Sequence, residues 1–172
     1  MFNPKIGITI GFDSAEIKHK SDFNFVLWDT PPLGTNYDSI IQGYLLHSDG
    51  VILMFDISNE EDFKELPYCL ELITDFYELE EFPVLLVANK IDLVRKISKE
   101  EIQKFLDKNK FIGYFEVSSK TLQNVDESIN FMANYIYNKE NSFPKGENLH
   151  DDNNSKVGTD FSLLDYMKSY LY

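Results

Sequence analysis

The stretch Pro83-Val84-Leu85-Leu86-Val87-Ala88-Asn89-Lys90-Ile91-Asp92 joins an apolar run directly to a short, mostly polar segment. A continuous apolar run of this length is typical of a strand that is buried on both faces, as in a parallel sheet. In such sheets, the loops that follow the carboxyl ends of the strands bind ligands. The sequence therefore predicts a binding loop at residues 89–92.

The side chains of this loop suit one particular ligand class. An aspartate carboxylate such as that of Asp92 can accept two parallel N–H bonds from the edge of guanine, a pattern that adenine does not offer. The stem of Lys90 can lie along the plane of a base, and the amide of Asn89 can tie neighbouring loops together. The alternative is an ordinary polar turn, but the buried strand before the loop favours guanine recognition.

A second segment supports the same interpretation. Glu116-Val117-Ser118-Ser119-Lys120 ends the next predicted strand, so its loop should lie beside residues 89–92 at the top of the sheet. Successive backbone N–H groups there could contact a ring carbonyl. By itself this segment would be a plain surface turn. Its position after a strand adds three residues to the predicted guanine site: Ser118, Ser119 and Lys120.

Strands and helices alternate along the chain, which predicts a doubly wound, mostly parallel α/β sheet. An antiparallel hairpin with a turn at Lys18–Ser21 precedes the parallel part. We expect Ser58 and Ser98 to cap two helices, each with a glutamate three residues later. The predicted strands cover residues 6–12, 22–28, 50–56, 83–88 and 111–117, and the predicted helices cover 38–46, 58–76, 99–109 and 124–137. The last helix has an apolar stripe formed by Val125, Ile129, Met132 and Ile136.

The composition changes near the C-terminus, which predicts three parts. Residues 1–138 form the α/β unit, and residues 139–158 are rich in Asn, Asp, Gly and Pro, as in a polar linker. Residues 159–172 are apolar again with near-helical spacing, which predicts an apolar C-terminal tail that can form a helix.

The overall composition excludes several function classes. A chain of 172 residues with a net charge of -13 lacks the basic face that nucleic acid requires. The single cysteine, Cys69, rules out a disulfide framework and favours a reducing, cytoplasmic setting. No run approaches the ~20 apolar residues of a membrane span, and the C-terminus has no prenylation cysteine. We therefore expect any membrane attachment to be peripheral and to depend on partners.

Two further segments carry groups suited to a hard cation. Asp29-Thr30 closes the strand that ends in Trp28, and an acidic residue at that point can hold Mg²⁺ through water. Thr9 lies in the preceding predicted strand, and its hydroxyl could be a direct Mg²⁺ ligand. Alone, a threonine in a strand is usually just a good strand former.

In their order and spacing, the segments at Thr9–Gly11, Trp28–Thr30, Gly50–Asp56, Asn89–Asp92 and Ser118–Lys120 resemble the Ras-like small GTPases, and within them the Rab branch. The resemblance implies a P-loop NTPase-like fold that binds GTP or GDP with Mg²⁺. It also implies a guanine-nucleotide switch in intracellular signalling or vesicle traffic. Effector and regulatory proteins would then bind the switch surface around Thr9 and Asp29.

The chain departs from the family pattern in its phosphate loop. No G-x-x-x-x-G-K-[ST] occurs in the sequence, although that loop cradles the phosphates and supplies a Mg²⁺ ligand. The family places its strand between the strands that end here at Trp28 and Asp56. We therefore expect a Ras-like domain that is incomplete at the N-terminus, with unpaired backbone groups along both of these strands.

The second departure follows Asp29-Thr30, where the family has a small residue, a glycine and a glutamine that orients the attacking water. Pro31, Pro32 and Leu33 stand there instead. Proline offers no N–H to a phosphate and leucine cannot orient water, so we expect poor hydrolysis and assign no catalytic residue. The alternative is a non-catalytic pseudo-GTPase that acts as a protein-interaction module. A further alternative places Phe161–Tyr172 in the position of the missing strand, although an unattached tail is the more frequent outcome.

Overall fold

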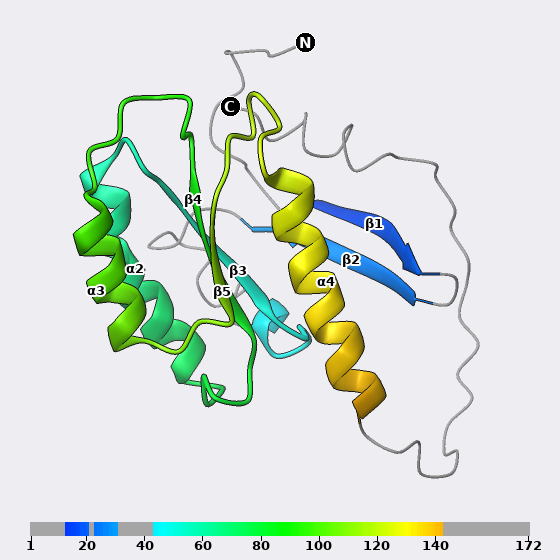
Figure 1. The fold of residues 1–172 in the computed structure, drawn as a ribbon. Coiled ribbons are helices and arrows are strands. Elements are labelled where there is room, and N and C mark those ends of the chain that lie inside the picture. The colour runs from blue at the N-terminus through cyan, green and yellow to red at the C-terminus, as the bar shows by residue number, and fades with distance from the viewer. Residues whose placement is uncertain (1–12, 21–22, 31–42, 143–172) are drawn as a thin grey trace, which may run out of the picture.

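The structure, a computed structural model, describes residues 13–20, 23–30 and 43–142. Within these ranges the chain forms a two-stranded antiparallel sheet and a three-stranded parallel sheet with helices on both faces (Figure 1). The elements in chain order are β1 (Asp13–Lys20), β2 (Phe23–Asp29), β3 (Val51–Asp56), α2 (Glu60–Thr74), β4 (Val84–Asn89), α3 (Lys99–Lys108), β5 (Gly113–Glu116) and α4 (Val125–Ser142). The predicted α/β class and the parallel sheet are confirmed.

The parallel sheet has the order β3-β4-β5, with Phe55 opposite Ala88 and Ala88 opposite Glu116. Its central strand β4 supplies side chains to two separate cores. Val84, Leu86 and Ala88 pack in the core that α2 and α3 cover, whereas Leu85 and Val87 pack in the core under α4. Figure 1 shows the resulting layers, with α2 and α3 on one side of the sheet and α4 on the other. Residues on both faces of β4 are therefore apolar, as expected for a strand in a parallel sheet.

The N-terminal hairpin differs from the prediction. The strand that pairs with β2 is β1, so the segment Lys18–Ser21, predicted as the turn, contributes Lys18 and Lys20 to a strand. Ala15 is buried and Ile17 is partly buried, while their neighbours Glu16 and Lys18 are exposed. This alternation suits a strand with one solvated face, where polar side chains are tolerated. The strand predicted at residues 6–12 lies outside the described residues.

In the part of the chain that the structure describes, no strand pairing joins the two sheets. Among the described strands, β2 pairs only with β1 and β3 pairs only with β4. Even so, Phe25 of β2 belongs to the same core as Leu85, Val87 and Met132, so the hairpin packs under α4. The ring of Phe23 also contacts Tyr137 of α4 edge to face, with centroids 5.3 Å apart. Shared core packing, and not a strand pairing between described residues, therefore joins the hairpin to the parallel sheet.

The helix caps were predicted correctly in one case and wrongly in the other. At α3, the Ser98 hydroxyl accepts from the Glu101 N–H, and the Glu101 carboxylate accepts from the Ser98 N–H. At α2 the cap is Asn59, whose side-chain oxygen accepts from the Glu61 N–H. Ser58 does not cap α2, because its hydroxyl donates to the Asp56 carboxylate instead.

The remaining predicted elements have similar ranges, with shifts of a few residues at their ends. All four stripe residues of α4 are buried, as predicted, and the helix continues five residues beyond the predicted end at Tyr137. Of the helix predicted at residues 38–46, only a helical turn at 43–45 lies in the described part. Most of the predicted linker and the entire apolar tail lie outside it. None of the described helices is long and apolar enough to span a membrane.

Candidate functional site

The predicted binding loops meet at the carboxyl ends of β3, β4 and β5. Strand β4 ends at Asn89, beside Asp56 at the end of β3. The Ile91 N–H then donates to the Val117 carbonyl at 3.2 Å, which links the loop after β4 to the segment after β5. All six residues predicted to hold guanine are consequently brought to one edge of the parallel sheet.

Asn89 connects the two loops through one side-chain oxygen. Its Oδ1 accepts from the Ser119 N–H at 3.0 Å and from the Ser119 hydroxyl at 3.1 Å. The same atom accepts from the Lys90 N–H at 2.7 Å. Lys90 has a φ of 65°, a left-handed conformation that a non-glycine residue rarely adopts, and this contact stabilises it. The predicted role of the asparagine amide in tying the loops together is observed.

Asp92 faces the second loop across the site. Its Oδ1 accepts from the Ser118 hydroxyl at 2.6 Å, and its Oδ2 lies 3.7 Å from the Lys120 ammonium. The Asp92 side chain is 17% exposed, whereas that of Lys120 is 52% exposed. Each carboxylate oxygen has two lone pairs, so both retain acceptor capacity beyond these contacts. The carboxylate is therefore fixed in place and still able to accept hydrogen bonds from a ligand.

The loop after β5 is held by buried polar contacts. Ser118 is fully buried, and its hydroxyl accepts from the Thr121 N–H while its own N–H donates to the Gln123 carbonyl. Leu122 and Asn124 have φ values of 64° and 58°, so the chain turns tightly between this loop and α4. These bonds hold the loop that carries Ser119 and Lys120 in a defined conformation.

Lys90 projects toward β3. Its ammonium lies 2.7 Å from Oδ2 of Asp56, whose Oδ1 accepts from both the N–H and the hydroxyl of Ser58. Burial by itself would raise the pKa of Asp56, but the hydrogen bonds from Lys90 and Ser58 outweigh it, so the pKa is lowered. Asp56 is thus ionised at neutral pH and holds the lysine side chain along the top of the sheet.

The structure gives roles to three residues that the sequence analysis did not assign to the site. The Arg95 guanidinium donates from Nη2 to Oε2 of Glu116 at 2.5 Å, and the Tyr114 hydroxyl donates to Oε1 at 2.9 Å. Burial by itself would raise the pKa of Glu116, but the hydrogen bonds from Arg95 and Tyr114 outweigh this effect, so the pKa is lowered. The sequence signal was slight: Arg95 is the one arginine among 16 basic residues.

The remaining predicted residues belong to the other sheet. Asp29 ends β2 and Thr30 follows it, and both are partly buried. Thr9 lies outside the described residues. In the described ranges, no group of three His, Cys, Asp or Glu side chains is placed to hold a metal ion. The predicted Mg²⁺ ligands therefore stay predictions.

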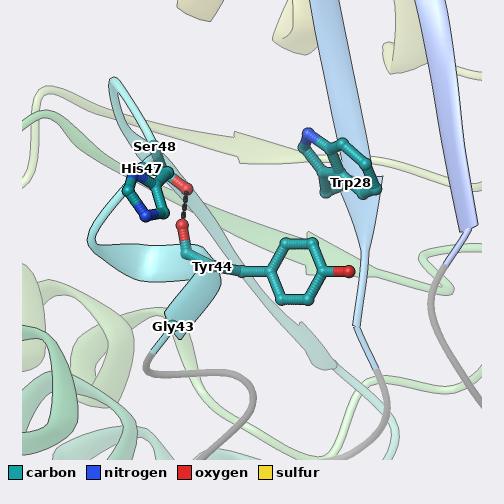
Figure 2. Close-up of a pocket in the computed structure, with 5 residues that line it drawn as sticks. All are labelled: Trp28, Gly43, Tyr44, His47 and Ser48. Carbon is teal, nitrogen blue, oxygen red and sulfur yellow. Dashed lines mark hydrogen bonds between the residues drawn. The ribbon is translucent and has the colours of Figure 1, made fainter.

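A hollow lies beside the end of β2. It has a volume of about 480 Å³ and is lined by Trp28, Gly43, Tyr44, His47 and Ser48. Figure 2 shows the Tyr44 ring extending toward the Trp28 indole; the two ring centroids are 5.1 Å apart. Trp28 is 48% exposed, so this aromatic pair is open to solvent. None of these lining residues is one of the six predicted guanine contacts.

The layered α/β fold, with polar loops at the carboxyl ends of its parallel strands, defines the class of small GTPase-like domains. Comparison with known families agrees, because the Ras family model matches residues 1–138, and the chain belongs to that family. Its relatives identify it as Rab-like.

Three Rab proteins illustrate this similarity. Ras-related protein Rab-12 of Mus musculus is 32% identical over 124 residues, which cover 71% of this chain and 50% of the relative. Rab-32D of Dictyostelium discoideum is 35% identical over 138 residues, which cover 74% of this chain and 60% of the relative. Rab-39A of Homo sapiens is 31% identical over 137 residues, which cover 78% of this chain and 62% of the relative. The chain thus spans between half and two thirds of the length of these relatives.

Proposed function

We propose that this chain binds the base of a guanine nucleotide through Asn89, Lys90, Asp92, Ser118, Ser119 and Lys120. The observation that carries the proposal is the Asp92 carboxylate, which Ser118 holds at 2.6 Å in a loop that is itself fixed to Asn89. A carboxylate that is held in place before binding loses little conformational entropy when the ligand binds.

The chemistry of the base favours guanine over adenine. Guanine presents two adjacent N–H donors, the ring N1–H and the exocyclic amine, which match the two oxygens of one carboxylate. Adenine has an acceptor at the ring position, so it would leave the Asp92 carboxylate facing a lone pair. The ammonium groups of Lys90 and Lys120, which lie 2.7 Å from Asp56 and 3.7 Å from Asp92, balance the charge of these carboxylates where the base would bind.

We place the phosphate and Mg²⁺ end of the nucleotide toward β2. Asp29 fits a cation held through water, because it supplies a carboxylate at the end of the strand, and Thr30 and Thr9 supply hydroxyls. Mg²⁺ usually combines one or two carboxylates with phosphate oxygens and waters. When bound, the cation would neutralise the charge of the phosphates.

We expect hydrolysis by this chain to be impaired or absent. Pro31 and Pro32 lack the N–H groups that could contact a phosphate, and Leu33 cannot orient a water molecule. The nucleotide would then act as a switch ligand whose binding changes the surface around Asp29.

That surface is the proposed site for effector and regulatory proteins in signalling or membrane traffic. The exposed Trp28 and the partly buried Tyr44 form an aromatic pair next to Asp29, beside a hollow. Aromatic side chains that are partly exposed and held against each other are frequent anchors in protein interfaces. Nucleotide bound at Asp29 would alter the backbone next to this pair.

A second candidate function is a pseudo-GTPase that acts as an interaction module without nucleotide. The Pro31-Pro32-Leu33 sequence favours it, because this segment has lost the groups for phosphate contact. The prearranged Asp92 carboxylate counts against complete loss of nucleotide binding.

Titration of the full chain with fluorescent GDP, GTP and ADP, with and without Mg²⁺, separates these functions. We expect guanine nucleotides to bind at micromolar concentration or tighter and at least about tenfold more tightly than ADP, because one lost charge-assisted hydrogen bond costs that much. Failure of GDP and GTP to bind would support the pseudo-GTPase and overturn guanine recognition.

A further inference from the structure

We propose that Arg95 is a positioning residue for guanine recognition. It ties the loop that carries Asp92 to the end of β5 and so fixes the Asp92 carboxylate relative to Ser119. The inference rests on the proposed guanine-binding function. Arg95 lies three residues after Asp92, and its partner Glu116 lies two residues before Ser118. The Arg95–Glu116 pair therefore joins the two segments that carry the predicted guanine contacts.

Three of the contacts between these segments follow one another along the chain from Ile91 to Arg95. The Ile91 N–H donates to the Val117 carbonyl, Asp92 accepts from Ser118, and Arg95 donates to Glu116. The first contact fixes the beginning of the loop and the third fixes its end. Asp92 lies between them, so its backbone cannot move away from the second loop unless one of these contacts breaks.

The arginine side chain has two contacts, which restrict its orientation. While Nη2 donates to Glu116, Nη1 lies 3.4 Å from the Ile97 carbonyl and donates to it. The side chains of Arg95 and Glu116 are 29% and 30% exposed, so water competes only partly for this pair. The Glu116 carboxylate is further fixed by the Tyr114 hydroxyl, and the Glu116 carbonyl accepts from the Asn124 side chain.

The choice of arginine is informative in this chain. Arg95 is the only arginine, whereas the other 15 basic residues are lysines. A planar guanidinium offers several donors in fixed directions, whereas an ammonium is a compact point charge on a flexible stem. A guanidinium therefore suits a position that must contact a carboxylate and a carbonyl in two directions. The hydrogen bond that Arg95 donates to Glu116 also raises the pKa of Arg95, whose guanidinium is charged throughout the neutral range.

The decisive experiment compares GDP with IDP, whose hypoxanthine base lacks the exocyclic amine of guanine. The amine is one of the two donors that Asp92 would bind, so the ratio of the two affinities reports how well this carboxylate is placed. For Arg95→Ala in the full chain, we expect GDP affinity to fall about tenfold, as for one charge-assisted hydrogen bond. IDP affinity should change less, so the GDP-to-IDP ratio should fall several-fold. A purely structural role would weaken both nucleotides equally and leave the ratio unchanged, which would overturn the proposal.

Two further variants, Glu116→Gln and the double variant with Arg95→Ala, test whether Arg95 acts through Glu116. Lys96→Ala is the matched control, because this neighbouring exposed lysine makes no side-chain hydrogen bond or ion pair in the described part of the chain, and its ratio should equal that of the wild type. Glu116→Gln should lower the ratio, and the double variant with Arg95→Ala should lower it no further than Arg95→Ala alone. Additive effects in the double variant would show that the two residues act separately, contrary to the proposal.

Amide hydrogen exchange without nucleotide keeps this test independent of the proposed function. In Arg95→Ala we expect the amides of Ile91 and Ser119 to exchange about tenfold faster, because their bonds to Val117 and Asn89 open more often, while Leu86 in the core stays unchanged. Unchanged exchange at Ile91 and Ser119 would overturn the positioning role. If the wild type binds neither GDP nor IDP, the proposed function fails, and the exchange result still decides whether Arg95 holds the loops.

Discussion

Asn89 supports the candidate site with a single oxygen atom. Its Oδ1 accepts from two donors of Ser119 and from the Lys90 N–H, and Ser119 is only 8% exposed. Removing the acceptor would leave the N–H and the hydroxyl of Ser119 without this partner in a place that water reaches poorly. Buried donors without an acceptor lower the stability of the folded state.

Asn89→Ala should therefore lower the free energy of unfolding by about 2 kcal/mol, the cost of leaving a buried polar group unsatisfied. Urea unfolding at neutral pH measures this change in the free energy of unfolding. The control is Asn130→Ala on the exposed face of α4, which should change stability by less than about 0.5 kcal/mol. Equal effects of the two substitutions would contradict the role given to Asn89.

Asp56 should make stability depend on pH. Its pKa is lowered in the folded state, since the hydrogen bonds from Lys90 and Ser58 outweigh the effect of burial. A carboxyl group with a lowered folded pKa contributes stability above its unfolded pKa of about 3.9, and this contribution is lost as pH falls through the folded pKa.

We expect Asp56→Asn to be less stable than the wild type at pH 7 by roughly 1 kcal/mol, a modest value because the Lys90 side chain is 48% exposed. The difference should shrink as pH falls below about 4 and vanish once Asp56 is protonated in the wild type. Urea unfolding of both proteins from pH 7 to pH 3 measures it. A difference that stays constant over this range would contradict the ion-pair explanation.

At the scale of elements, α2 contains its own weak point. Pro67 lies in the interior of this helix, eight residues into it, and is exposed. Proline has no N–H to donate to the Phe63 carbonyl, and its ring crowds the preceding turn. The helix nevertheless forms, because Leu66, Leu70 and Ile73 are buried against the sheet. Tertiary packing here outweighs local preference.

Pro67→Ala should stabilise the protein by roughly 2 kcal/mol, less than the full helix penalty of about 3 because proline also restricts the unfolded chain. Thermal and urea unfolding measure the change. Glu71→Ala, also exposed on α2, is the control and should have little effect. A loss of stability in Pro67→Ala would mean that the proline ring contributes packing that outweighs its cost.

The same elements show which features the sequence could predict. Strand β4 and the stripe of α4 follow from apolar periodicity, which depends only on local spacing. The cap of α2 was misplaced by one residue because Ser58 and Asn59 are both good caps, and only the Asp56 contact decides between them. The hairpin turn was predicted too early in the chain, because polar residues such as the exposed Lys18 occur both in turns and on the solvated face of a strand.

At the scale of the whole molecule, the site depends on contacts between distant segments. The guanine residues were predicted because they follow strands in a recognisable order. The Arg95–Glu116 contact joins residues that are 21 positions apart, and no local pattern predicts it. The aromatic pair of Trp28 and Tyr44 likewise depends on how the hairpin meets the helical turn at residues 43–45.

The central claim is that Asp92 reads guanine, and a change of base specificity tests it most directly. In Asp92→Asn, the side chain keeps one acceptor for the ring N1–H but presents an N–H where the guanine amine would lie. Xanthine has a carbonyl at that position and would accept this bond.

The measurement is the affinity of the full chain and of Asp92→Asn for fluorescent GDP and XDP, with Asp107→Asn on the exposed end of α3 as the control. We predict that Asp92→Asn loses about 100-fold in GDP affinity, because one charge-assisted bond is lost and the other becomes neutral, and gains XDP affinity, while Asp107→Asn matches the wild type. GDP binding that is equally tight in Asp92→Asn and the wild type would contradict guanine recognition by Asp92.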